Sequence, residues 1–174
     1  MRSAYHYTPE RIFDRIKAEE VLRPSSGIVS GNWKIPKDIF IPREKYTFAL
    51  LDEPEPESWK ESGFMDLLMN KLWAKSNVER GLLRSVFGGA PNYVLVSFPV
   101  EGSEAYVLDS QHLVDNKSLK DDEMLEKYLN SMVPLEDYEN QYSMPELAVG
   151  SEIPLDLITV VEVRKCIKPK WALF

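Results

Sequence analysis

The chain has 174 residues and a formal net charge of −7. This length suits one domain, because a core of this size hides enough apolar surface without dividing in two. The content of 44% hydrophobic and 28% charged residues lies near the average of folded chains and excludes wholesale disorder. We therefore expect a single domain over residues 1–174.

Residue counts and the lengths of apolar stretches exclude disulfides, some metal sites, secretion and insertion into a membrane. The one cysteine, Cys166, excludes an internal disulfide and a cysteine-rich zinc site. With only His6 and His112, a metal held by several imidazoles is excluded as well, so no metal site is expected. The sequence near the N-terminus has no apolar stretch of signal-peptide length, and no window approaches the roughly 20 apolar residues of a membrane helix. We expect a cytoplasmic protein with no membrane partner.

Acidic residues are concentrated in the second half of the chain. Residues 1–100 hold 14 basic and 13 acidic side chains, whereas residues 101–163 hold 3 and 15. Nonspecific binding to nucleic acid needs clustered Lys or Arg, so a broad nucleic-acid surface is disfavoured. A local basic groove within residues 11–45 stays open as a place for a nucleotide.

The first expected elements are a strand and a helix. The strand covers Ser3–Tyr7. Thr8, Pro9 and Glu10 then form a helix start: a hydroxyl cap, a proline whose missing donor does no harm, and a first-turn acid. The helix is expected to end near Glu20.

A long loop and two further elements come next. Regular apolar spacing is lost from Arg23 to Lys45, where prolines and glycines indicate a loop. Tyr46–Leu51 then has the composition of a short strand, and Ser58 opens a helix to about Lys75.

The second half of the sequence is predicted to alternate short strands with a helix. Tyr93–Pro99 and Ala105–Asp109 read as strands, and the polar turn between them predicts a hairpin. Met124–Met132 has helical spacing, while Glu146–Val149 and Ile158–Val163 read as strands. Helices placed among mostly short strands indicate an α+β fold.

Familiar catalytic signatures are absent from the sequence, which has no GxxxxGK[ST], GxGxxG, GxSxG or HExxH. It contains instead a series of short motifs in a fixed order: Tyr5-His6-Tyr7-Thr8, Leu22-Arg23-Pro24, Tyr46–Leu50, Ala105–Asp109, and Met144–Val149 followed by Ile153-Pro154-Leu155. The series resembles ADP-ribosyltransferase-like domains. Its last segment is similar to the one that holds the catalytic glutamate in DarT-like enzymes of the His-Tyr-Glu class.

This resemblance implies a split β-sandwich, or a central mixed sheet, with flanking helices. It also implies a toxin-like or stress-response enzyme that transfers ADP-ribose from NAD to an unknown protein or small-molecule acceptor and releases nicotinamide. The family's ribose-binding histidine, nicotinamide-packing tyrosine and catalytic glutamate fall on His6, Tyr46 and Glu146. The last role fits the chemistry, because a fixed carboxylate favours the oxocarbenium character that develops on the ribose.

The remaining ligand contacts have more than one candidate. Tyr7 competes with Tyr46 for the nicotinamide. Thr8, although expected to cap a helix, is placed to contact NAD as well. Arg23 and Arg43 flank the long loop, and either is a candidate for the NAD phosphates.

Simpler interpretations stand beside these. His6 can be a half-buried histidine satisfied by a backbone group, and Glu146 can be one solvated charge among many. A second hypothesis is a noncatalytic ligand-binding or protein-interaction module on the same scaffold, since a fold does not determine activity. A third is an unrelated α+β interaction protein in which the motif matches arise by chance.

Overall fold

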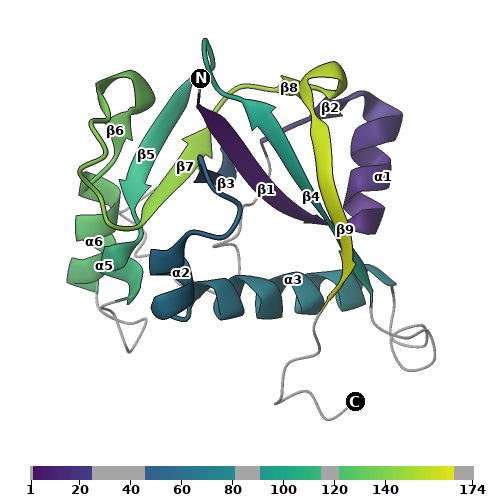
Figure 1. Ribbon diagram of the computed structural model, residues 1–174, viewed down its shortest axis with the longest axis horizontal. Coiled ribbons are helices and arrows are strands. Elements are labelled where there is room, and N and C mark those ends of the chain that lie inside the picture. The colour runs from purple at the N-terminus through teal and green to yellow at the C-terminus, as the bar shows by residue number, and fades with distance from the viewer. Residues whose placement is uncertain (1, 25–45, 81–90, 115–121, 167–174) are drawn as a thin grey trace.

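The computed structural model describes residues 2–24, 46–80, 91–114 and 122–166. Helices are interspersed among the strands along the chain, and most of the strands join one seven-stranded sheet (Figure 1). The α+β class expected from the sequence is confirmed.

The large sheet has the strand order β6-β5-β7-β3-β1-β4-β9, and a separate two-stranded sheet pairs β2 with β8. Every pairing among the described strands is antiparallel. The alternative expectation of a central mixed sheet is therefore wrong for these strands. The strands are β1 (Ser3–Pro9), β2 (Val21–Leu22), β3 (Thr47–Leu51), β4 (Asn92–Pro99), β5 (Ala105–Asp109), β6 (Val133–Pro134), β7 (Pro145–Val149), β8 (Ile153–Pro154) and β9 (Thr159–Lys165).

The large sheet is open along part of its length between β1 and β3. Strand β1 pairs with β4 along all seven of its residues, but with β3 only at Ala4–Leu51 and Tyr5–Leu50. Beyond Tyr5 the two strands separate, and Figure 1 shows β1, β4 and β9 diverging from β3, β7 and β5. The sheet therefore consists of two halves that meet near the start of β1.

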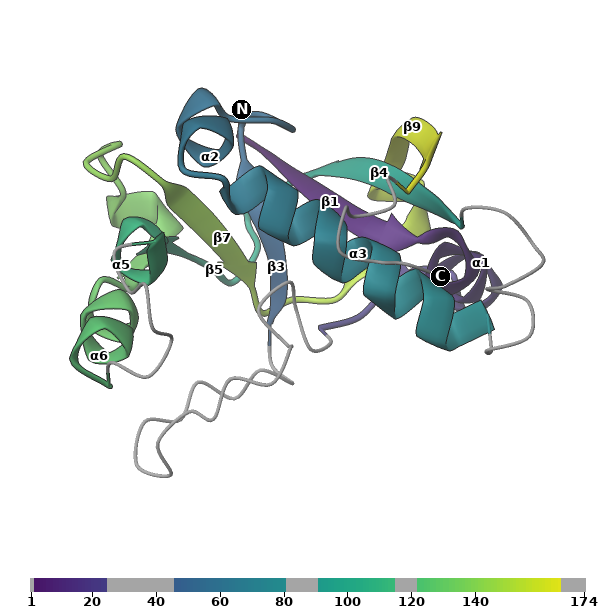
Figure 2. The same ribbon diagram turned by 90° about the horizontal axis from the view of Figure 1, so that it is seen from below.

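Helices cover both faces of this divided sheet. They are α1 (Glu10–Glu19), α2 (Glu57–Glu61), α3 (Phe64–Arg80), α5 (Gln111–Val114) and α6 (Asp122–Asn130), with short 3-10 helices η2 (Leu135–Asp137) and η3 (Leu155–Leu157). Figure 2 shows α3 running across the sheet, with α5 and α6 together beside β5. Figure 1 shows that α3 crosses the end where the two halves have diverged.

Strand alternation distributes the apolar side chains between the two faces. On one face, Ala49 and Leu147 pack in a cluster with Phe13 and Ile16 of α1. On the other face, Leu50 packs in a cluster with residues of α2 and α3. A third cluster, also on this second face, joins Phe48, Leu108 and Ala148 to Leu113 of α5 and Tyr128 of α6. Buried residues on one strand thus alternate between two separate cores.

The predicted helix cap at Thr8 is wrong. Thr8 and Pro9 pair with Val94 and Tyr93 of β4, so the backbone stays extended through Pro9 and the helix begins at Glu10. No side chain caps this helix, and Thr8 is buried. Pairing with β4 outweighs the capping preference of Thr8, which contributes only about 1 kcal/mol.

The predicted hairpin is also wrong, because β4 pairs with β1 and β9 whereas β5 pairs with β6 and β7. The two strands lie in different halves of the sheet. The single helix expected from Ser58 to about Lys75 is two helices, separated at Gly63, whose φ of 77° interrupts a helical backbone. The other expected strands and the helix at Met124–Met132 are confirmed within a few residues.

Candidate functional site

Glu146 lies near the centre of the β3–β7–β5 half of the sheet. Its register partners are Leu50 on β3 and Leu108 on β5, so it has a strand on each side. Its side chain is 0% exposed and lies on the face covered by α3, α5 and α6. The interpretation of Glu146 as a solvated surface charge is therefore wrong.

Two hydroxyl groups bind one oxygen of this carboxyl group. The Tyr128 hydroxyl donates to Glu146 Oε2 at 2.6 Å, and the Ser110 hydroxyl donates to the same atom at 3.0 Å. Tyr128 comes from the buried side of α6, and Ser110 follows β5, where its own N–H donates to the Met144 carbonyl at 2.9 Å. Both donors are held by ordered backbone, so the carboxyl group has a fixed orientation.

The other carboxyl oxygen, Glu146 Oε1, is buried and has no hydrogen-bond partner within the described part of the chain. A buried polar atom without a partner is uncommon, because leaving one unsatisfied costs about 1–3 kcal/mol. Within the described residues, Oε1 is thus the atom of this group whose hydrogen-bonding capacity is unused, and it is shielded from solvent.

Burial is the main influence on the ionisation of Glu146. Loss of solvent raises the pKa of its carboxyl group above the ordinary value, while the hydrogen bonds from Tyr128 and Ser110 and the charge of Lys71 oppose that rise. Lys71 belongs to α3, the helix that crosses the open end of the sheet. Its positive charge lowers the pKa of the Glu146 carboxyl group.

His6 lies on β1, where that strand has separated from β3. Its Nδ1 is 2.9 Å from the Phe48 carbonyl oxygen. Because a carbonyl oxygen only accepts, Nδ1 carries the proton in this contact. A side-chain hydrogen bond thus links β1 to β3 just beyond the last backbone pair, Tyr5–Leu50. The simple interpretation of His6, a half-buried histidine satisfied by a backbone group, is confirmed, and a role with ligand stays a prediction.

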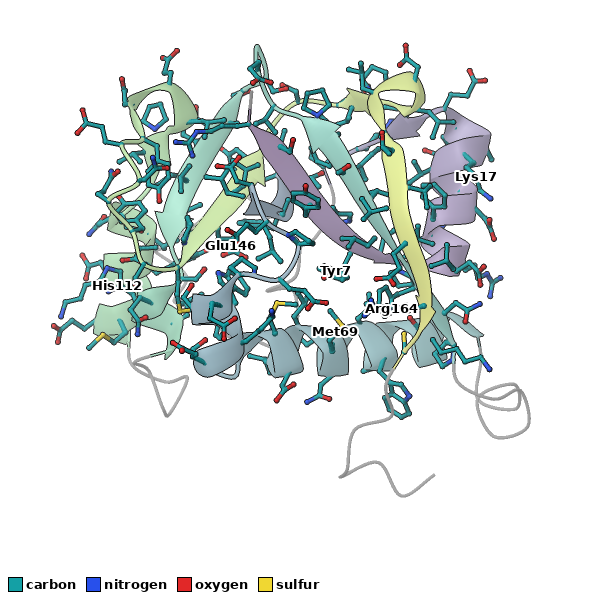
Figure 3. The ribbon with its side chains drawn as sticks, viewed as in Figure 1. Tyr7, Lys17, Met69, His112, Glu146 and Arg164 are labelled. Atoms are coloured by element: carbon teal, nitrogen blue, oxygen red, sulfur yellow. The ribbon has the colours of Figure 1, made fainter. Side chains whose placement is uncertain are left out.

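His6 and Glu146 stand on opposite sides of the opening, and their side chains start from different faces of the sheet. Tyr5, Leu50 and Glu146 form one row across three strands, so their side chains share the face covered by α3. By alternation His6 starts from the other face, and its ring lies at the opening between the strands. Figure 3 shows Glu146 on the β7 half and Tyr7 on the β1 half, both above α3.

Tyr7 and Thr8, both expected to bind the cofactor, are buried. The Tyr7 hydroxyl donates to the Pro54 carbonyl at 2.8 Å, and burial, with Glu55 next, raises the pKa of this phenol well above its usual range. The Tyr7 ring lies 5.6 Å from that of Tyr93. In this structure both residues contribute to the core beside the opening.

The remaining predicted contacts lie farther from Glu146. Tyr46 precedes β3 by one residue, four positions from Leu50, which is on the order of 13 Å along a strand. Its ring meets those of Phe48 and Tyr106 edge-on, at 6.5 and 5.8 Å between centroids. Burial, followed by Tyr106, raises the pKa of its phenol. The structure therefore does not bring Tyr46 next to Glu146.

Of the two arginine candidates, Arg23 lies within the described residues. Arg23 is exposed and forms ion pairs with Glu19 at 2.8 Å and Glu152 at 3.1 Å. Such surface pairs contribute little to stability. Arg43 lies outside the described residues.

Comparison with known proteins adds no relatives: no family model, no curated protein and no solved structure matches this chain. Within the described ranges, His, Cys, Asp and Glu form no group of three or more that could hold a metal ion. None of the helices described is long and apolar enough to cross a membrane.

A surface depression of about 610 Å³ lies at the other end of β5 from Glu146. Its lining includes Arg2, Tyr106 and three acidic residues, Glu101, Glu104 and Glu136. The depression belongs to neither the predicted NAD contacts nor the Glu146 carboxyl group.

Sequence analysis missed Tyr128, Ser110 and Lys71. Tyr128 recurs at helical spacing with apolar neighbours, and that pattern predicts core packing without revealing what its hydroxyl binds. Ser110 directly follows a predicted strand. A buried glutamate requires polar partners, but nothing in the sequence marks Glu146 as buried, so the sequence held no signal for these contacts.

Proposed function

We propose that the protein is an NAD-dependent ADP-ribosyltransferase that acts on a protein or small-molecule acceptor. The observation that carries the proposal is the Glu146 carboxyl group, which is buried, oriented by two hydroxyl donors and left with one oxygen unpartnered among the described residues. The partial separation of β1 from β3 supports it, because a split β-sandwich is the fold that the motif order implies.

Cleavage of the bond between nicotinamide and ribose requires a carboxylate in a fixed position. When the bond between nicotinamide and ribose breaks, positive charge grows on the ribose, and a fixed negative group beside it stabilises that transition state more than the ground state. Tyr128 and Ser110 hold Oε2, so Oε1 would meet the ribose without losing a hydrogen bond once the side chains that bury it move aside. Low solvent access strengthens this attraction.

The β1 side of the opening supplies the second part of the site. His6 holds the Phe48 carbonyl through Nδ1, which fixes its imidazole ring at the opening. In the proposed role the imidazole binds a ribose hydroxyl of NAD. Because His6 and Glu146 start from opposite faces of the sheet, one dinucleotide would reach both only by passing through the opening between β1 and β3.

The decisive experiment measures nicotinamide release from NAD by the wild type and by Glu146→Gln, with Glu57→Gln as control. Glu57 carries the same charge on a side chain that is 75% exposed. Loss of one well-placed electrostatic contact typically lowers the rate about 10²-fold, so we expect that loss for Glu146→Gln and none for Glu57→Gln. Turnover by Glu146→Gln equal to wild type, with both folded by thermal melts, would remove Glu146 from catalysis.

A second function is a noncatalytic module that binds NAD or a related ligand. Complete burial of Glu146 favours it, since a raised pKa increases the uncharged form, which cannot stabilise a cation. Saturation with NAD at about 100 times its dissociation constant stabilises a fold by roughly 2.7 kcal/mol. An NAD-dependent rise in melting temperature without nicotinamide release, when candidate acceptors are supplied, would select the module.

A further inference from the structure

Strand β9 forms one margin of the large sheet. It is the outermost strand in the order of the described strands, and Figure 1 shows it alongside β4, in the half of the sheet away from β5 and β6. An outermost strand presents a row of backbone donors and acceptors that can pair with another chain. Its partner β4 satisfies only the inner row.

Apolar side chains are exposed along this margin. Val160, Val161 and Val163 are 46%, 47% and 53% exposed, and all three are β-branched residues that favour a strand. By register, Val160 and Val163 lie opposite Val96 and Val94, on the face that α1 covers. Sheet edges are commonly protected by charges or bulges. This edge has a bulge and charged residues from Glu162 onward, and it also exposes three valines in four positions.

The bulge in β9 leaves the second half of the strand regular. The register shifts between Leu95 and Val96 on β4, so Val161 is the extra residue on β9. From Glu162 to Lys165 the pairing with β4 is continuous. This regular stretch is the part suited to accept a further strand.

The charges on the regular stretch determine which strand fits. Glu162 and Arg164 share one face, because they lie opposite Leu95 and Tyr93, and within the chain they form an ion pair with each other. A second copy running antiparallel about an axis at Val163 places Glu162 of each copy opposite Arg164 of the other. An axis at Glu162 would place two glutamates face to face, and one at Arg164 would place two arginines face to face. Opposite charges across a strand pair stabilise it and like charges destabilise it.

We infer that β9 is a self-association edge, at which two copies of this chain pair antiparallel about Val163 into one continuous sheet. Val163 of one copy contacts Val163 of the other on the face that α1 covers. On the opposite face, Glu162 and Arg164 of each copy form two ion pairs with the other copy. A pair of strands this short covers less than the roughly 800 Å² per partner of a standard interface, so we expect dimers in the micromolar range. This inference is independent of the proposed enzymatic function.

The test is sedimentation velocity over about a hundred-fold range of concentration. Wild type should shift from monomer to dimer. Glu162→Arg and Arg164→Glu should each self-associate on the order of ten-fold more weakly, because each creates two like-charged pairs. An equimolar mixture of the two variants should form heterodimers, since every cross-strand charge pair is then opposite in sign. Glu123→Arg, a reversal on a side chain that is 71% exposed on α6, should behave as wild type.

The mixture protects the inference from a folding artefact, because a misfolded variant cannot restore association. Val163→Lys, which places two lysines on the axis, gives a further variant that should remain monomeric. A wild type that stays monomeric throughout would overturn the inference. So would single reversals that dimerise like wild type, or a mixture of two folded variants that fails to associate.

Discussion

Replacing Glu146 with Gln tests the state of the buried carboxyl group without relying on any enzymatic activity. The side-chain oxygen of Gln accepts the same hydrogen bonds from Tyr128 and Ser110 that Glu146 Oε2 accepts now. The amide nitrogen then takes the place of Oε1, and its two unpaired N–H groups cost about 1–3 kcal/mol at every pH. The variant can no longer ionise, so the pH dependence of its stability relative to wild type isolates the carboxyl group.

The sign of that dependence follows from the direction of the pKa shift. Burial raises the pKa of Glu146 in the folded state above its unfolded value, so between the two values the folded protein holds a proton that the unfolded chain releases. Stability of the wild type relative to Glu146→Gln is therefore greatest below the unfolded pKa and is lost as pH rises towards the folded pKa. Within that window the slope approaches about 1.4 kcal/mol per pH unit.

The assay is urea unfolding of both proteins from about pH 4 to about pH 8. The absolute difference between them matters less than its slope, because the amide penalty is constant with pH. A flat difference would mean that folding does not shift the pKa of Glu146. A wild type that gains on the variant as pH rises would mean that the two hydroxyl groups and Lys71 outweigh burial.

Three further outcomes are expected. Tyr128→Phe keeps the ring in the core but removes the 2.6 Å hydrogen bond to Glu146, and should lower the free energy of unfolding by about 1–3 kcal/mol in urea titrations; no change would show that water replaces the hydroxyl. His6→Ala should weaken NAD binding in calorimetry while a thermal melt still shows a folded protein, and unchanged affinity would remove His6 from the site. Duplex DNA should bind weakly at physiological salt, because acidic residues dominate the chain after residue 100; submicromolar binding with a steep salt slope in a fluorescence titration would contradict this.

The fold could be predicted from sequence where one element has one strong pattern. Ser3–Tyr7 and Ile158–Val163 have strand composition throughout, and both form strands in the structure. The pairing of strands could not be predicted from the sequence, because β4 and β5 are neighbours along the chain and yet lie in different halves of the sheet. The Gly102 turn between them has the composition of a hairpin, but the partners of both strands come from distant segments.

The candidate site was predictable in part. A motif resemblance selected Glu146, but the surrounding acids gave no sign that, among those whose burial the structure describes, this carboxyl group is the one fully buried. Burial arises because β7 has β3 on one side and β5 on the other, a fact of sheet order that local spacing does not contain. For the same reason the hydroxyl groups of Tyr128 and Ser110, 18 and 36 residues away in sequence, could not be paired with it in advance.

The same ionisation of Glu146 should affect stability and the proposed activity in opposite directions. Only the charged carboxylate stabilises a ribose cation, so nicotinamide release should increase as pH rises through the raised pKa of Glu146. The fold loses stability between the unfolded pKa and this folded pKa, because the unfolded chain accommodates the charge more easily. Measuring kcat against pH beside the urea titrations compares the midpoint of the activity rise with the pH at which the stability loss levels off. Coincidence would assign both effects to this carboxyl group, whereas activity independent of pH across the stability transition would separate catalysis from Glu146.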